Sequence, residues 1–195
     1  MKGSVLLPIR IFIDQGHNPT GYHNAGATGN GLLEQDINYQ VGVYLADLLN
    51  SDSRFEARLS RPTPTTVLGT NNATSLRERV QMANSWPADY FISIHCNSNP
   101  NPAINGTEIY LYQYGTQAEW LAQRIMAGIT SAVGTRNNGI RLNQGLYVLR
   151  RTQMPALLIE LGYLTNISDA EKLENNQYQF AYGIYQGILQ YFGFA

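Results

Sequence analysis

Short apolar runs alternate along this chain with segments in which apolar residues recur every three or four positions. The first kind of segment is typical of buried strands and the second of amphipathic helices. Strands that alternate with helices favour a largely parallel sheet covered on both faces. We therefore predict an α/β fold: a single domain with a mostly parallel mixed sheet of about six strands and helices on both faces. The expected strands are residues 9–13, 55–59, 90–95, 107–112, 146–150 and 156–161, and the clearest helices lie over residues 34–50, 121–129 and 181–192.

The length and composition of the chain fit one globular domain. Its 195 residues are 44% hydrophobic and 14% charged, enough to bury a sizeable core. Residues 1–8 are predicted to be an N-terminal extension, without the apolar length of a signal peptide, and residues 9–195 to be the domain. Because no segment approaches the roughly 20 apolar residues that cross a bilayer, we expect no membrane span.

Two tetrapeptides predict where helices begin. Ser75-Leu76-Arg77-Glu78 and Ser168-Asp169-Ala170-Glu171 both have the pattern of a capping box. In a capping box the first and fourth side chains satisfy each other's free backbone amides. We expect one helix to start at each of them.

The charge pattern argues against a nucleic-acid partner. The formal net charge is −1, and the basic residues occur in isolated pairs such as Arg77/Arg79 and Arg150/Arg151. Binding to nucleic-acid phosphates requires clustered Lys and Arg side chains. We therefore expect no nucleic acid among the partners of this protein.

Cys96 is the only cysteine, so the chain can form no internal disulfide. It follows His95, which raises the alternative of a Cys/His nucleophile. Adjacent residues on a strand point to opposite faces of the sheet, so a buried free thiol is the favoured interpretation.

Four side chains suited to metal binding or acid/base chemistry lie near strand ends or a helix start. His17 follows the first strand, His95 ends the third, and Glu160 lies near the end of the last. Glu34 opens the first helix, which begins on the same side of the sheet. Ligands of an open α/β sheet bind beyond the carboxyl ends of its strands. The four groups are therefore predicted to converge at one edge of the sheet.

This set of side chains matches the needs of a zinc hydrolase. Two imidazoles and one carboxylate are sufficient ligands for a catalytic Zn²⁺, which keeps a fourth position for water. A second carboxylate nearby can act as general base and then protonate the leaving nitrogen. Glu160 suits this role because it interrupts an apolar run, where a carboxylate is costly unless it faces a polar cavity or a metal.

Each of the four residues also has a simpler interpretation. A lone histidine at a strand end is commonly a hydrogen-bonded core or loop residue. Glu34 can simply be a negative charge that favours a helix N-terminus, and Glu160 can pair with Arg150 or Arg151. The chain contains no HExxH motif. Spacing alone leaves these alternatives open.

Five motifs follow one another in order along the chain. They are Asp14-Gln15-Gly16-His17, Gly31-Leu32-Leu33-Glu34, and residues 75–84, 88–97 and 147–166. Together they resemble the zinc-dependent N-acetylmuramoyl-L-alanine amidases of the family 3 type, which include cell-separation, sporulation and germination enzymes and phage endolysins. The resemblance runs from about residue 9 to the C-terminus, so residues 9–195 would be an amidase catalytic domain.

The resemblance implies a function and a role for each site residue. His17, Glu34 and His95 would bind one Zn²⁺ per chain, and Glu160 would be the catalytic acid/base. The reaction would be hydrolysis of the amide bond between N-acetylmuramic acid and L-alanine of peptidoglycan. The enzyme would act at the bacterial cell wall, whether secreted, spore-associated or released by a phage. The chain departs from the family at Asn18 and Pro19, which reshape the loop beside the metal without removing a ligand.

Two loops are predicted to border the metal and to contact substrate. Residues 16–31 follow the first strand and bring Tyr22, His23 and Asn24 to one rim. Residues 97–105 follow His95 and begin with Asn97. Amide and aromatic side chains can hydrogen-bond and stack against a peptide or sugar. The alternative is that both loops are solvated connectors.

Two other functions stay open at this point. A zinc peptidase that cleaves a bond within the stem peptide of the same polymer would use the same metal chemistry. A non-catalytic wall-binding module would keep the fold, but it need not keep three metal ligands and a general base together.

Overall fold

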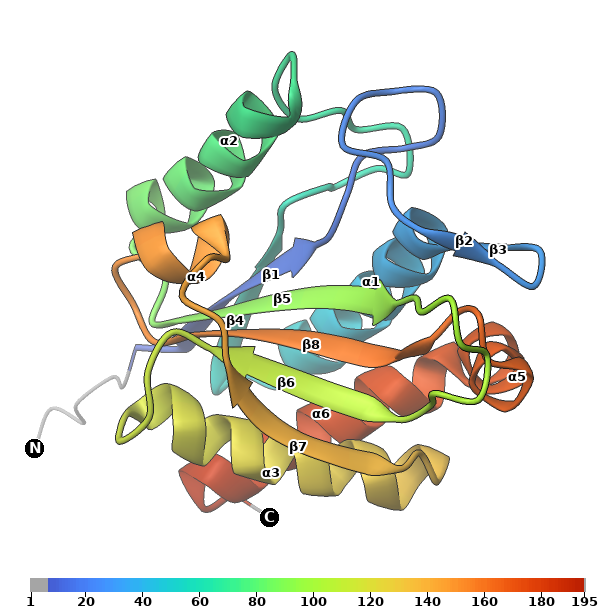
Figure 1. The fold of residues 1–195 in the computed structure, drawn as a ribbon. Helices are drawn as coiled ribbons and strands as arrows, with labels where there is room; N and C mark the ends of the chain where they lie inside the picture. The colour runs from blue at the N-terminus through green and yellow to red at the C-terminus, as the bar shows by residue number, and fades with distance from the viewer. Residues whose placement is uncertain (1–6, 195) are drawn as a thin grey trace, which may run out of the picture.

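Strands and helices alternate in the computed structural model, which describes residues 7–194 (Figure 1). The strands are β1 (Ile9–Gln15), β2 (Thr28–Gly29), β3 (Leu32–Leu33), β4 (Phe55–Leu59), β5 (Tyr90–Asn97), β6 (Thr107–Leu111), β7 (Asn137–Leu142) and β8 (Ala156–Tyr163). The helices are α1 (Glu34–Asn50), α2 (Asn72–Ser85), α3 (Gln117–Val133), α4 (Tyr147–Arg151), α5 (Ile167–Asn175) and α6 (Gln177–Phe192).

One six-stranded sheet organises the fold, in the order β4-β1-β5-β8-β6-β7. All neighbouring strands are parallel except β6 and β8, which run antiparallel. This arrangement confirms the predicted mostly parallel mixed sheet. Its register places Glu160 of β8 between His95 of β5 and Glu108 of β6. These three side chains therefore lie in one row across the sheet.

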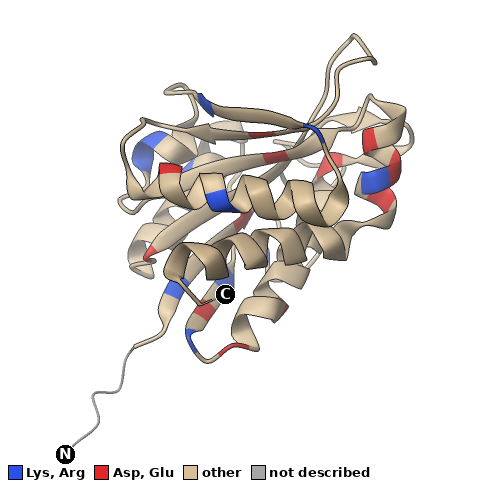
Figure 2. Ribbon diagram, turned by 90° about the horizontal axis from the view of Figure 1, so that it is seen from below, with Lys and Arg blue, Asp and Glu red and all other residues tan. Residues whose placement is uncertain are grey.

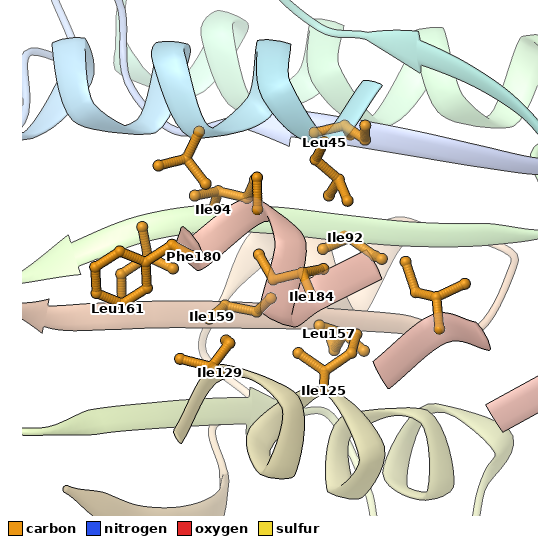
Figure 3. Close-up of a cluster of buried hydrophobic side chains, with 14 of the residues drawn as sticks. Leu45, Ile92, Ile94, Ile125, Ile129, Leu157, Ile159, Leu161, Phe180 and Ile184 are labelled. Carbon is orange, nitrogen blue, oxygen red and sulfur yellow. The ribbon is translucent and has the colours of Figure 1, made fainter. Parts of the chain in front are cut away.

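Helices cover both faces of the sheet, as predicted. The larger core lies between the sheet and α1, α3 and α6, where Ile92, Ile159 and Ile184 meet (Figure 3). The smaller core lies on the opposite face, where Phe91 packs with side chains of α2 and α4. Full burial of one such side chain contributes about 1.5–3 kcal/mol. Both cores hold the central strands rigidly, and the strand ends carry the candidate site.

The segment expected as a strand at residues 146–150 is helical, and this prediction was wrong. It forms the single turn α4, with Val148 and Leu149 buried against the smaller core and Arg150 and Arg151 exposed. A short apolar run does not distinguish a strand from a buried helical turn. The sixth strand of the sheet is instead β7, which begins with the polar residues Asn137 and Asn138 and carries only Ile140 and Leu142 as apolar side chains. Its backbone pairs with β6 at the sheet edge.

Both helices are capped a few residues upstream of the predicted cap residues Ser75 and Ser168. Asn71 caps α2: its side chain accepts from the backbone of Thr74, and Thr74 Oγ1 accepts from the backbone of Asn71. Asn166 caps α5 by accepting from the backbone of Asp169. Ser75 is buried within α2 rather than at its start. Asparagine is as strong a cap as serine, and in both segments it stands upstream of the predicted start.

The predicted boundary at residue 8 falls at the start of the described region. Residues 1–6 lie outside the described residues, and β1 begins at Ile9. Within the described part of the chain, none of the helices has the length and apolar character of a membrane span. Charged residues of both signs are dispersed along the ribbon (Figure 2).

Candidate active site

Three chain-distant side chains converge where β1 and β5 end and α1 begins. His17 Nε2 lies 3.1 Å from Oε1 of Glu34, and His95 Nδ1 lies 2.9 Å from the same oxygen. One nitrogen from each histidine and one oxygen of Glu34 all lie within 4.8 Å of one another. The predicted convergence of these three residues at one edge of the sheet is present.

The donor atoms of this cluster fit a zinc ion. Two imidazole nitrogens and one carboxylate oxygen form the ligand set of many catalytic zinc sites, which leave a position open for water or substrate. The two imidazole rings meet edge to face, with centroids 4.8 Å apart. Each ring directs one nitrogen at Oε1 of Glu34. His17, Glu34 and His95 can therefore hold a metal ion.

Glu34 is fixed from several sides. Its Oε2 accepts the backbone amide of Ala27 at 2.8 Å, and its Oε1 accepts that of Cys96 at 3.1 Å. Burial opposes the ionisation of Glu34, but hydrogen bonds to His17 and His95 more than offset it and lower the pKa of its carboxyl group. The side chain is therefore held as a carboxylate, the form that binds a metal.

The imidazole of His17 is oriented by the chain around it. Its Nδ1 lies 3.1 Å from the main-chain oxygen of Asn24, so this nitrogen is placed to donate and Nε2 is left for a metal. The residue has a φ of 70°, a conformation that only a few non-glycine residues adopt. Such strain persists only where the surrounding structure imposes it.

Gly16 allows the close approach of His95. A Cβ atom on Gly16 would overlap the imidazole ring of His95. Any larger residue at this position would push the ring away from Glu34. The glycine of the Asp14-Gln15-Gly16-His17 motif is therefore required by the packing of the second histidine.

Glu160 lies beside this cluster on β8, in register with His95. Its Oε2 atom is buried and has no hydrogen-bond partner among the described residues. Burial, together with the nearby carboxylates of Glu34 and Glu108, raises the pKa of Glu160 well above its ordinary value. A carboxyl group whose pKa is raised in this way holds a proton more readily than an ordinary one, a property suited to general acid/base chemistry.

The alternative that pairs Glu160 with an arginine is not supported. Arg150 and Arg151 are exposed at the end of α4, and no ion pair joins Glu160 to an arginine within residues 7–194. Arg150 instead lies over the ring of Tyr147. The carboxyl group of Glu160 therefore stays free to face the candidate metal cluster.

Comparison with known proteins agrees with this geometry. A family model described as N-acetylmuramoyl-L-alanine amidase matches residues 11–190, nearly the whole chain. The chain belongs to the N-acetylmuramoyl-L-alanine amidase family.

Individual relatives of this amidase family cover most of the chain. N-acetylmuramoyl-L-alanine amidase LytC of Bacillus subtilis is 36% identical over 93% of the chain, which spans 35% of the length of that relative. The sporulation-specific N-acetylmuramoyl-L-alanine amidase of the same species is 34% identical over 94% of the chain and 68% of its own length. The crystal structure of N-acetylmuramoyl-L-alanine amidase from Clostridium difficile 630 is 34% identical, with a TM-score of 0.84, over 96% of this chain and 98% of that one.

Arg79 is a residue of this candidate site that the sequence analysis did not single out. Its guanidinium is buried, lies 2.6 Å from Asp14, and donates to the main-chain oxygens of Gln15 and His17, also at 2.6 Å. It thus holds the turn that carries His17. An arginine on a predicted helix gives no local sign that it is buried, so only the ordered motif that contains it could have indicated a role.

Glu108 is a second residue that was not singled out. It is buried directly opposite Glu160, and it accepts from the hydroxyl groups of Tyr110 and Tyr163 at 2.7 and 2.8 Å. Arg141 completes the group, with Nη2 3.3 Å from Oε1 of Glu108. The alternation of β6 was visible in the sequence, but the antiparallel pairing that brings Glu108 to Glu160 was not.

The loop residues expected to touch substrate have different environments. Tyr22 is 55% exposed and Asn97 ends β5. His23 Nε2 lies 3.0 Å from the main-chain oxygen of Leu68, and Asn24 donates to Ser75 at 3.1 Å. His23 and Asn24 therefore tie this loop to neighbouring segments, whereas Tyr22 presents its ring to solvent.

Asn18, which follows His17 in the loop after β1, is a buried hydrogen-bonding residue. Its Nδ2 donates to the main-chain oxygen of Leu68 at 3.0 Å, and its Oδ1 accepts from the backbone amide of Leu68 and from Arg79. The amide side chain thus joins the loop after β1 to the segment before α2. These contacts of Asn18 do not involve the side chains of the candidate metal ligands.

Proposed function

We propose that this chain is the catalytic domain of a zinc-dependent N-acetylmuramoyl-L-alanine amidase. It would hydrolyse the amide bond between N-acetylmuramic acid and L-alanine in peptidoglycan, with one Zn²⁺ held by His17, Glu34 and His95. The observation that carries the proposal is the convergence of these three ligand atoms beside Glu160, whose buried Oε2 has no partner among residues 7–194. A wall-binding module would have no need for this combination.

Glu160 has the proton-transfer role in the proposed reaction. Its carboxylate accepts a proton from the water that attacks the scissile carbonyl carbon. The same carboxyl group then donates that proton to the nitrogen of L-alanine as the carbon–nitrogen bond breaks, so no net proton stays on the enzyme. A zinc ion supplies Lewis acidity, which makes water more acidic and the carbonyl more electrophilic.

The neighbouring residues orient this chemistry. The backbone amides of Ala27 and Cys96 hold the Glu34 carboxylate, and the carbonyl of Asn24 fixes the tautomer of His17. A preorganised set of ligands loses little free energy to rearrangement when substrate arrives. Residues 9–195 would form this catalytic domain, residues 1–8 an N-terminal extension, and the site of action would be the bacterial cell wall.

Analysis of the products tests the proposal directly. Purified peptidoglycan is digested by the zinc-loaded protein, with and without a chelator, and the muropeptides are identified by mass spectrometry. We expect free lactyl groups on muramic acid, together with peptides that begin at L-alanine, and we expect the chelator to abolish both. New amino termini from within the stem peptide would instead identify a zinc peptidase, and the absence of any cleavage would contradict an enzymatic function.

A further inference from the structure

A polar hollow lies beside β6, which neighbours the Glu160 strand β8 on the side away from β5 and His95. Glu108 lies directly opposite Glu160 on the same face of the sheet, and it also lines this hollow. The other polar walls come from β7, from the segment just before it, and from the loop after β5. We call it the β6–β7 hollow; its polar lining residues are Asn99, Asn105, Glu108, Arg136, Asn138 and Arg141.

Both carboxyl oxygens of Glu108 accept hydrogen bonds, whereas Oε2 of its neighbour Glu160 has no partner among the described residues. The donors to Glu108 are the hydroxyl groups of Tyr110 and Tyr163, and one of its oxygens also meets Arg141. Within the β6–β7 hollow, Glu108 therefore holds the guanidinium of Arg141 in place.

Arg141 uses only part of its guanidinium for this contact. Nη2 faces Glu108 and the main-chain oxygen of Asn138, while Nη1 and Nε have no hydrogen-bond partner within residues 7–194. The side chain is 52% exposed. Arg136 is exposed and also lines the hollow. Two arginines against one carboxylate give the hollow a formal charge of about +1, and the planar fork of arginine matches a carboxylate.

The spacing of the strands places the β6–β7 hollow within reach of a stem peptide. Neighbouring strands lie about 4.8 Å apart, so β6 is roughly 10 Å and β7 roughly 14 Å from β5, which carries His95. Consecutive Cα atoms are about 3.8 Å apart, so the second stem residue lies roughly 4–8 Å beyond the scissile amide. The long side chain of Arg141 spans the remaining distance between β7 and this second stem residue.

We propose that the β6–β7 hollow binds a carboxylate of the stem peptide, at the residue that follows L-alanine, through the free edge of Arg141. Arg136 adds positive charge to the same hollow. The inference rests on the proposed function, because it assumes that the scissile amide lies between the metal ligands and Glu160. Arg141 is then a specificity-determining residue that distinguishes a carboxylate from its carboxamide.

Two muramoyl dipeptides test this inference with the zinc-loaded enzyme. They are identical except that the second residue carries a free carboxylate in one and a carboxamide in the other. We expect the wild type to favour the carboxylate through a lower KM. Arg141→Met should raise the KM for the carboxylate substrate roughly ten- to hundredfold, the usual effect of losing a charged hydrogen bond, and change kcat much less.

Further variants separate recognition from a structural role. On the carboxamide substrate Arg141→Met should raise the KM far less. Arg141→Lys should retain part of the preference for the carboxylate, because lysine keeps the positive charge but not the planar guanidinium group. Arg124→Met, an exposed arginine on α3, is the control and should behave as wild type. An equal rise in KM on both substrates, or a wild type that does not distinguish the carboxylate from the carboxamide, would overturn the inference. A wild type that cleaves neither dipeptide nor intact peptidoglycan would instead refute the proposed function.

Discussion

Nη2 of Arg79 donates a hydrogen bond to the main-chain oxygen of His17 at 2.6 Å. The same guanidinium lies 2.6 Å from Oδ1 of Asp14, and both side chains are 1% exposed. A buried ion pair thus stands directly behind the turn that presents His17. Through this contact a residue of α2, which touches no candidate ligand side chain, fixes where the candidate ligand His17 lies.

Arg79→Met should therefore lower both stability and zinc affinity. It leaves the Asp14 carboxylate buried without its partner, which typically costs about 3–5 kcal/mol, and it releases the main-chain oxygen of His17. Chemical denaturation and zinc titration of the folded variant measure the two effects. Arg77→Met, at an exposed position of the same helix, is the matched control. Unchanged zinc affinity in a folded Arg79→Met protein would show that the ion pair does not position His17.

The Asp14–Arg79 pair also predicts how stability depends on pH. Burial raises the pKa of Asp14, but the charge and hydrogen bond of Arg79 outweigh it, so the folded pKa lies below the ordinary value of 3.8. The stabilisation is fully present above pH 3.8 and is lost as the pH falls through the lower, folded value. The melting temperatures of wild type and Asp14→Asn should thus differ at pH 7, and this difference should begin to shrink only below about pH 4, as the pH falls toward the folded pKa. A constant difference across this range would contradict the assignment.

Gly16→Ala tests the packing of His95. The added Cβ would overlap the imidazole ring, so His95 must move away from Glu34. Changes to the groups that orient a metal ligand typically lower affinity about 10–100-fold, and we expect a loss of zinc affinity of this size with the fold retained. Gly145→Ala, in the exposed segment before α4, serves as control. Wild-type affinity in Gly16→Ala would mean that His95 does not need this close approach.

Tyr22 is the best candidate for substrate contact among the loop residues. It is 55% exposed, whereas His23 and Asn24 are engaged by neighbouring segments. Tyr22→Ala should reduce turnover of intact peptidoglycan several-fold and leave zinc content and melting temperature nearly unchanged. Tyr182→Ala, which removes a 42% exposed ring from α6, controls for the loss of a surface aromatic residue. Equal turnover by the two variants would make the loop of residues 16–31 a connector.

The sequence was sufficient to predict much of this fold because its strands and long helices have strong periodicity. The helix predicted over residues 34–50 is α1, and the apolar runs that contain Ile13 and Ile94 are central strands. The convergence of His17, Glu34 and His95 could be predicted as well. Parallel strands present their carboxyl ends at one edge of the sheet, so their topology brings distant residues together.

Features that depend on pairing between distant segments could not be predicted in this way. The strand β7 carries only two apolar side chains, Ile140 and Leu142, and its pairing with β6 through backbone hydrogen bonds leaves no signal in the sequence. The residues 146–150 form a helical turn because Val148 and Leu149 fill the smaller core together. Glu108 and Arg79 contact partners far along the chain, such as Tyr163 and Asp14, which the local sequence does not reveal.

A comparison of Glu160, the proposed acid/base, with Glu34, a proposed metal ligand, tests the central claim most directly. Zinc content and kcat are measured side by side for Glu160→Gln and Glu34→Gln. We expect Glu160→Gln to keep about one zinc ion per chain and to lose at least about a hundredfold in kcat, since a positioned acid/base typically contributes 10²–10⁴. Glu34→Gln should lose the metal and with it the activity. Release of zinc by Glu160→Gln with retention by Glu34→Gln, or full activity of either variant, would contradict the account.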